Sequence, residues 1–256
     1  MESTRVVFPG AGKHELVGRW EVPSAGPMRW AAVYASCFTC IKDLKGARRI
    51  CRQLTDHGFG ILRFDYMGLG ESKGDFAEST FTTFVGDIVA AAGFITREFA
   101  APQLLIGHSI GGSASLVAEQ SVPSTRLIAT VNSPVVTHHL GEMILREFPT
   151  LGASGPKEMS FAGGRPVRVS QALADSLIEA DVERALPGIQ ADLLVFQATQ
   201  DSMLGTRHAE RIFQGAKSPK SFIQLPEADH LLIEREQDAQ FIANVIGAYA
   251  NSHWST

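Results

Sequence analysis

No apolar run in the sequence approaches the roughly 20 residues that a membrane-spanning helix needs. No apolar stretch of signal-peptide length follows the first five residues. No block of basic residues occurs either, and the net charge of −4 argues against a nucleic-acid partner. We therefore expect a soluble, cytoplasmic protein that binds neither a membrane nor nucleic acid.

Cysteine is scarce, with three residues in the chain. Cys37 and Cys40 form a C-x-x-C pair, but no second pair completes a zinc site, so we expect no metal. We predict that both cysteines are reduced and do not act as a redox pair. Gly68 and Gly70 suggest a dinucleotide-binding loop, yet Lys73 stands where the third glycine belongs. No cofactor is expected.

The sequence contains instead a regular alternation of short apolar segments and helical patterns. The apolar segments predict strands at residues 5–8, 16–22, 31–35, 61–64, 104–106, 127–131, 193–196 and 222–225. Helical patterns occupy residues 43–56, 81–95, 113–120, 207–214 and 236–250. Asp43 is the predicted N-cap of the first helix. This alternation indicates an α/β fold, with a mostly parallel sheet of about eight strands flanked by helices.

The alternation is interrupted between residues 135 and 187. This stretch holds a Gly163-Gly164 turn between two short strand-like runs, and its pattern predicts a helix at residues 170–185. Connections this much longer than usual are typically lids or binding elements. We predict that residues 1–256 form a single domain and that residues 135–187 are a lid inserted between core strands.

The most informative stretch is the G-x-S-x-G match Gly107-His108-Ser109-Ile110-Gly111. An apolar strand runs into it and a helical stretch runs out of it, which is the context of a nucleophile elbow. The two flanking glycines keep side chains away where the strand and the helix nearly touch. A serine on so sharp a turn has its hydroxyl pushed into a cleft, so we predict that Ser109 is a nucleophile.

A serine hydroxyl needs a base that takes its proton, and that base needs an orienting acid. In an open α/β sheet such groups lie on loops at the carboxyl ends of strands. Of the eight histidines, only His230 stands just beyond a late strand. His108 flanks the serine, but its side chain is expected to point elsewhere. His230 is therefore the predicted base.

Asp201 follows the predicted strand at residues 193–196 and is the predicted acid. Two other carboxylates are alternatives. Asp229 is too close to His230 in sequence to orient its ring easily, and Asp65 follows an earlier strand.

Negative charge that develops on a substrate carbonyl oxygen calls for two amide donors, the oxyanion hole. The amide of Ile110 opens the helix behind Ser109, so the helix dipole supports it. The second donor should come from the loop after residues 31–35, where we predict Phe38. In the lid, His138 and His139 are candidates for contact with the substrate.

The serine–acid–histidine order of Ser109, Asp201 and His230 resembles the α/β-hydrolase superfamily across nearly the whole chain. Several runs further resemble one bacterial group, the hydrolase domain often fused to an OsmC-like peroxide-reducing domain: residues 36–44, 62–65, 68–72, 74–77, 104–112, 163–166 and 228–232. The resemblance implies an α/β-hydrolase fold and an esterase-like activity with these three residues as the triad. We expect no OsmC-like domain after Ala250, and therefore no peroxidase activity of the fused relatives. Ser36 replaces a histidine that braces the oxyanion loop in many hydrolases.

We predict a cofactor-free serine hydrolase that cleaves small carboxylic esters or thioesters through an acyl-enzyme. One alternative is an aminopeptidase or acyltransferase on the same triad, in which Glu142, Glu147 or Glu158 of the lid would bind a substrate amine. Another is a non-catalytic ligand-binding protein of the same fold, which the complete triad argues against. The natural substrate and the oligomeric state, a homodimer included, stay open.

Overall fold

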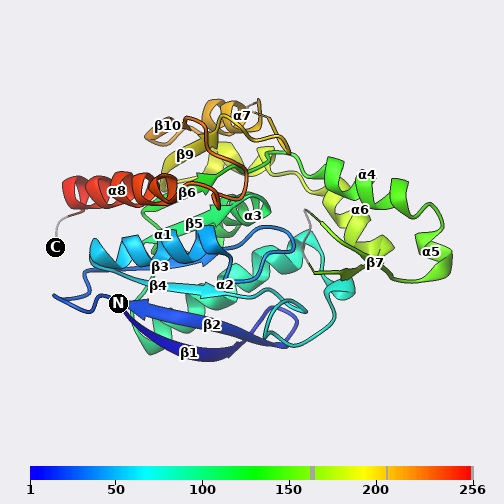
Figure 1. Ribbon diagram of the computed structural model, residues 1–256, viewed down its shortest axis with the longest axis horizontal. Helices are drawn as coiled ribbons and strands as arrows, with labels where there is room; N and C mark the ends of the chain where they lie inside the picture. The colour runs from blue at the N-terminus through cyan, green and yellow to red at the C-terminus, as the bar shows by residue number, and fades with distance from the viewer. Residues whose placement is uncertain (162–164, 206, 255–256) are drawn as a thin grey trace.

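The fold is seen in a computed structural model that describes residues 1–161, 165–205 and 207–254. Its centre is an eight-stranded sheet in the order β1-β2-β4-β3-β5-β6-β9-β10 (Figure 1). The strands are β1 (Glu2–Pro9), β2 (Glu15–Val22), β3 (Trp30–Ala35), β4 (Phe59–Phe64), β5 (Leu104–His108), β6 (Leu127–Val131), β9 (Asp192–Ala198) and β10 (Lys220–Leu225). β2 is antiparallel to β1 and β4, and the other pairs are parallel. The predicted mostly parallel sheet of about eight strands is confirmed.

Helices cover both faces of this sheet. They are α1 (Lys45–Asp56), α2 (Phe81–Glu98), α3 (Ile110–Ala118), α7 (Arg207–Gly215) and α8 (Glu236–His253). α2 and α3 pack on one face, while α1 and α8 lie side by side on the other (Figure 1). Every residue of β3, β4, β5 and β6 is consequently buried, which explains why their sequences are mostly apolar. Within the described residues, no helix is both long and apolar enough to cross a membrane.

The parallel strands end at the same edge of the sheet, and this brings distant loops together. His108 at the end of β5 is in register with Val131 at the end of β6, which is in register with Phe196 of β9. In the same way Ala198 of β9 is in register with Leu225, the last residue of β10. The loops that follow these four strands therefore leave the sheet next to one another.

Between β6 and β9 the chain forms a group of small elements that extends past one end of the sheet (Figure 1, green to yellow). They are α4 (His138–Glu147), α5 (Leu151–Ser154), β7 (Lys157–Met159), β8 (Val167–Val169), α6 (Gln171–Glu179) and the 3-10 helix η3 (Glu183–Gly188). α4 packs against α6, and β7 pairs antiparallel with β8, as the two strand-like runs predicted. The Gly163-Gly164 turn lies outside the described residues.

The helix predicted at residues 170–185 is wrong at its carboxyl end. α6 begins after Ser170, whose hydroxyl caps it, but it ends at Glu179. Ala180 has an extended backbone, and Asp181 forms a β-bridge with Val136 on the other side of the insertion. This tertiary contact interrupts a sequence whose composition alone would continue the helix.

Asp43 does not cap α1, contrary to the prediction. The helix begins at Lys45, and Leu44 occupies the N-cap position. An Asp43 carboxylate oxygen instead accepts a hydrogen bond of 2.6 Å from the Arg63 guanidinium. The Asp43 side chain thus pairs with a charged residue of β4 and does not cap the helix.

Candidate active site

Ser109 occupies the sharp turn between β5 and α3. Its φ of 55° and ψ of −127° lie in a region that L-residues rarely adopt. The backbone is held there by a 2.8 Å hydrogen bond from the Ser109 amide to the Val131 carbonyl of β6. A strained serine between a strand and a helix is the geometry of a nucleophile elbow.

Gly107 and Gly111, on either side of Ser109, each permit a different close contact of α3. A side chain at Gly107 would collide with main-chain atoms of Gly111 and Gly112, so this position lets β5 touch the first turn of α3, as predicted. A side chain at Gly111 would instead collide with the carbonyl groups of Ala35 and Ser36. The second glycine therefore brings α3 against the end of β3 and the start of the loop that follows it.

Asp201 and His230 lie on the loops that follow β9 and β10, and their side chains are hydrogen-bonded. The distance from His230 Nδ1 to Asp201 Oδ2 is 2.7 Å, and both residues are buried. Because a carboxylate only accepts, Nδ1 carries the proton and Nε2 of the neutral ring keeps its lone pair. The other Asp201 oxygen accepts the amides of Met203 and Leu204, at 2.9 and 3.0 Å.

These contacts keep the Asp201 carboxyl ionised. Burial by itself would raise the pKa of Asp201, but the hydrogen bond and charge of His230, together with the two loop amides, lower it. A negative Asp201 can therefore hold the His230 ring in one orientation and stabilise its positive charge when it takes a proton.

The two alternative acids have other partners. The Asp229 carboxylate accepts the amides of Leu231 and Ile233, at 3.1 and 3.2 Å, and so shapes its own loop. Asp65 is fully buried, with a carboxylate oxygen 2.8 Å from the ammonium of Lys42. Among the described residues, Asp201 is the carboxylate that contacts the His230 ring.

Ser109 and His230 line one cavity of about 340 Å³. Within the described residues no hydrogen bond joins the Ser109 hydroxyl to His230, although they share this space. The insertion contributes part of the wall, and its side chains there are mostly apolar: His139, Leu140, Met143, Met159, Ser160 and Phe161. A nucleophile and a histidine–carboxylate pair thus face a small, largely apolar chamber.

Comparison with known proteins agrees with this arrangement. The family model described as "Alpha/beta hydrolase family" matches residues 6–244. The chain belongs to the alpha/beta hydrolase family. The superfamily and the hydrolase activity predicted from the sequence are confirmed at this level, and the fold is the α/β-hydrolase fold.

Three proteins to which this chain is similar are named as esterases or as a lipase. The esterase domain of a Rhodothermus marinus protein is 34% identical, with a TM-score of 0.79 over 98% of this chain and 99% of that one. Est1E from Butyrivibrio proteoclasticus, with ferulic acid bound, shares the fold at 16% identity, with a TM-score of 0.78 over 96% and 98% of the two chains. Monoglyceride lipase of Homo sapiens is 23% identical over 73% of this chain and 71% of its own.

Two buried residues of the hydrolase bind the main chain of His230, a contact that the sequence did not predict. His108 Nε2 donates to the His230 carbonyl at 2.7 Å, and Asn132 Nδ2 donates to the same oxygen at 2.9 Å. Burial, and next the charge of His230, lower the pKa of His108 to about 3, so its ring is neutral. The side chain of His108 does point away from the serine hydroxyl, as predicted, but toward the backbone of the base.

Phe38 lines the cavity from the loop that joins β3 to α1. Its ring packs against three other phenyl rings, with centroid distances of 5.5, 6.0 and 5.0 Å to Phe76, Phe84 and Phe161. Its amide donates no hydrogen bond within the described part of the chain. Ile110 is the first residue of α3, where a helix leaves its N–H groups without intrahelical partners. Both predicted oxyanion donors therefore lie next to Ser109 or its cavity.

Cys37 and Cys40 are joined by a disulfide, so the prediction of two reduced cysteines is wrong. The Cys40 amide donates to the Cys37 carbonyl at 3.2 Å, and this tight turn brings the two sulfurs together. Both residues line the cavity on either side of Phe38. The C-x-x-C spacing fits a reduced pair as well as a bonded one, so the sequence alone could not decide between them.

The two lid histidines differ in their surroundings. His139 lines the cavity of Ser109, whereas His138 lines a separate hollow of about 600 Å³ with His208. Burial, and next the charge of His138, lower the pKa of His139. Of the two predicted candidates, His139 is the one that reaches the space where a substrate would bind.

Neither His14 nor His57 is part of the described lining of the cavity. His14 is 3.7 Å from Glu78, and His57 contacts Asn244 at 3.0 Å. In the ranges that the structure describes, no three or more histidine, cysteine, aspartate or glutamate side chains are grouped so that they could hold a metal ion.

Proposed function

We propose that this hydrolase cleaves small carboxylic esters or thioesters through an acyl-enzyme on Ser109. His230 is the base and Asp201 the acid that orients it. The observation that carries the proposal is the 2.7 Å hydrogen bond between His230 and Asp201, beside the cavity that Ser109 also lines. Since Nδ1 gives its proton to this bond, Nε2 is the nitrogen that can accept the Ser109 proton.

The reaction then follows from these roles. His230 Nε2 takes the proton of Ser109 Oγ while that oxygen attacks the substrate carbonyl carbon. The amides of Phe38 and Ile110 donate to the resulting oxyanion. The imidazolium returns the proton to the leaving alcohol or thiol as the acyl-enzyme forms. Water, deprotonated by His230, attacks the acyl carbon. The acid is released as the imidazolium returns that proton to Ser109 Oγ, which restores the serine.

The cavity supports an apolar acyl group in preference to a peptide amine. Its described lining is mainly aromatic and aliphatic side chains with two methionines of the insertion, and it includes no carboxylate. Glu142, Glu147 and Glu158, the residues considered for binding an amine, are exposed and are not part of that lining. An amine would therefore enter this chamber without a charged partner, at a cost in desolvation.

The insertion supports a second part of the proposal, that residues 135–187 act as a lid of a single-domain enzyme. Six of its described residues line the cavity of Ser109, so a change in its position would change access to the serine. We also propose that the chain belongs near the bacterial hydrolase domains that are often fused to an OsmC-like domain. The 34% identity to the esterase domain of a Rhodothermus marinus protein supports that placement. Composition supports a cytoplasmic enzyme with a small-molecule substrate.

The test is hydrolysis of p-nitrophenyl esters from acetate to decanoate by the wild type and Ser109→Ala. We expect turnover to peak at one chain length, because the chamber is small. We expect Ser109→Ala to lower kcat by on the order of 10⁴ or more if the triad acts as a unit. Near-wild-type turnover by Ser109→Ala would contradict the mechanism. A folded wild type that neither hydrolyses esters nor reacts with a fluorophosphonate would favour a ligand-binding protein.

A further inference from the structure

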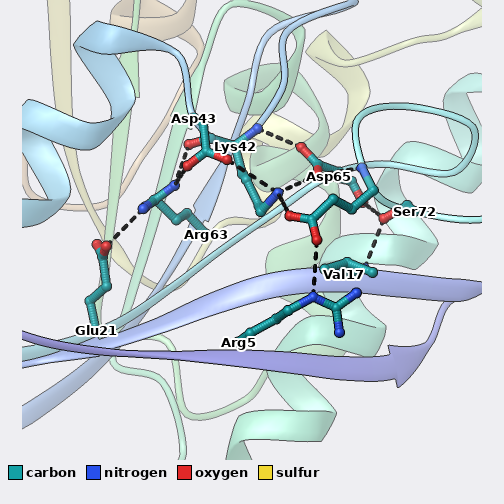
Figure 2. Close-up of polar contacts among 9 residues, drawn as sticks. Arg5, Val17, Glu21, Lys42, Asp43, Arg63, Asp65 and Ser72 are labelled. Carbon is teal, nitrogen blue, oxygen red and sulfur yellow. Dashed lines mark hydrogen bonds and ion pairs between the residues drawn. The ribbon is translucent and has the colours of Figure 1, made fainter.

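The loop at residues 36–44, which carries Phe38, ends on a buried ionic network (Figure 2). We refer to Lys42, Asp65 and Arg63 as the Lys42 clamp. The Lys42 and Asp65 side chains are 2% and 0% exposed, and the ammonium lies 2.8 Å from the carboxylate. Arg63 is also buried and pairs with Glu21 at 2.8 Å. Such groups are rarely buried unless they are paired, as they are here.

Within the clamp, Asp65 and Arg63 also bind the main chain of Lys42. The Lys42 amide donates to Asp65 Oδ1 at 2.6 Å, and its carbonyl accepts from Arg63 Nη1 at 2.8 Å. Arg63 belongs to β4 and Asp65 directly follows it, so both contacts come from a central strand. Hydrogen bonds to charged groups are shorter and stronger than neutral ones. Lys42 therefore has a fixed position relative to the sheet.

Asp65 connects this loop to a second part of the sheet. Its Oδ2 also accepts the Glu71 amide at 3.0 Å, and its carbonyl accepts the Ser72 hydroxyl at 2.6 Å. The Ser72 hydroxyl in turn accepts the amide of Val17, on β2, at 2.8 Å (Figure 2). The clamp is thus part of a continuous set of hydrogen bonds from β2 and β4 to the loop that bears Phe38.

Lys42 and Glu71 are both charged at neutral pH. Burial alone would lower the pKa of Lys42, but its hydrogen bonds to Asp65 and Glu71 outweigh burial and raise it. Hydrogen bonds from Lys42 and Arg5 lower the pKa of Glu71 to about 2. The Lys42–Glu71 ion pair at the end of the loop is therefore present throughout the pH range of an ester assay.

Closer to Phe38, the polar contacts of the loop are internal. The Ser36 hydroxyl is buried and has no partner among the described residues. The Cys37–Cys40 disulfide closes a small ring that contains Phe38, and Ile41 alone separates this ring from Lys42. A fixed Lys42 so close to this ring sets where the Phe38 amide points.

We propose that the Lys42 clamp positions the Phe38 amide in the oxyanion hole, an inference that rests on the proposed function. An oxyanion donor acts only at about 2.7–3.1 Å from the charged oxygen. A misplacement of about 1 Å can cost on the order of 10²-fold in rate. The clamp should therefore matter for the transition state and not for binding of the ground-state ester.

Asp65→Asn is the first test variant. The asparagine oxygen can still accept the Lys42 amide, but its NH₂ group then faces the Lys42 ammonium, donor against donor. Lys42 keeps Glu71 and Asp43 as partners, at 2.7 and 3.3 Å, so its charge is not left alone. Should this variant fail to fold, Arg63→Lys serves instead, because it keeps the charge but loses the guanidinium contact to the Lys42 carbonyl.

The matched control is Glu119→Gln. Glu119 is also a buried carboxylate, and it accepts the amides of Gln190 and Ala191 at 3.1 and 3.0 Å. It follows the far end of α3 and contacts neither Phe38 nor the clamp. This substitution should therefore report the loss of a buried carboxylate without a change in the oxyanion loop.

The measurements are kcat and KM per active site, counted by fluorophosphonate labelling, and inhibition by an arylboronic acid, which forms a tetrahedral adduct with the serine. For Asp65→Asn we expect kcat to fall roughly 10- to 100-fold. Boronic acid affinity should fall in parallel, while KM stays within about twofold. For Glu119→Gln we expect a lower Tm but unchanged kcat, KM and boronic acid affinity.

Two outcomes would overturn the inference in different ways. A folded Asp65→Asn protein with a lower Tm but wild-type kcat and boronic acid affinity per active site would show that the clamp only stabilises the fold. In that case the proposed function stands. A wild type that neither hydrolyses esters nor labels with fluorophosphonate would overturn the proposed function, and this inference with it.

Discussion

At the scale of single residues, substitution of His108 tests whether its hydrogen bond to the His230 carbonyl positions the base. His108→Phe keeps an aromatic ring at a fully buried position but removes the Nε2 donor, which leaves Asn132 as the described side-chain donor to the His230 carbonyl. A protein hydrogen bond contributes about 0.5–1.5 kcal/mol net. We therefore expect kcat per active site to fall roughly three- to tenfold, with KM nearly unchanged.

The pH profile of this variant distinguishes a structural ring from a titrating one. Because the pKa of His108 is lowered to about 3, its ring is neutral over the working range. The loss of kcat should then be uniform from about pH 5 to 9. His57→Phe, at an exposed contact with Asn244, is a control that should keep wild-type kinetics. A loss confined to acidic pH would contradict a neutral His108.

Residues of the site differ in how well the sequence could predict their place. The loops of Ser109, Asp201 and His230 follow from motif order, because parallel strands release their loops at one edge. The contact of His108 carries no such signal, since its partner is a main-chain carbonyl 122 residues away. The network around Lys42 could not be predicted from the sequence either, because charged residues in a loop are normally assigned to solvent.

At the scale of elements, Asp87 links α2 to two loops beside the sheet. Its carboxylate accepts the Ala11 amide of the β1–β2 turn at 3.0 Å and the Met67 amide after β4 at 3.4 Å. Burial raises the pKa of Asp87 from its ordinary 3.8 to about 6, although the two amides oppose this. The folded protein therefore binds a proton here more readily than the unfolded chain. This stabilisation is complete below about pH 4 and is lost as pH rises through about 6.

Asp87→Asn should remove this dependence. We expect the Tm of the variant, relative to the wild type, to rise between about pH 4 and 6 and to stay level above that, because only the wild type loses proton binding there. Thermal melts in one buffer series from pH 4 to 8 provide the comparison. A constant difference in Tm across the series would show that Asp87 does not titrate in this window.

The ends of elements are where the sequence predicted least. The central strands could be predicted because strands with helices on both faces have mostly apolar sequences, which are unusual in loops. The errors at Asp43 and at the end of α6 have a common cause in tertiary contacts, with Arg63 in the first case and Val136 in the second. Local propensity cannot register a partner that is distant in the chain.

At the scale of the whole molecule, the insertion shares its apolar core with the sheet. Ile144 of α4 and Leu173 and Leu177 of α6 belong to the same buried cluster as the inward residues of α2 and α3. A separate domain would have an apolar core of its own. The insertion and the sheet should consequently unfold together, in one transition.

Leu177→Ala tests this coupling, because Leu177 is fully buried in the insertion. Loss of a buried leucine costs about 2–5 kcal/mol. In a protein of this size that lowers Tm by roughly 5–15 °C. We expect calorimetry to show one transition, shifted as a whole, with ester hydrolysis lost at the same temperature. Ile178→Ala, at the neighbouring and 38% exposed position, should shift Tm far less. Two transitions, with hydrolysis lost at the first and the sheet melting later, would instead identify the insertion as an independent unit over a core that folds without it.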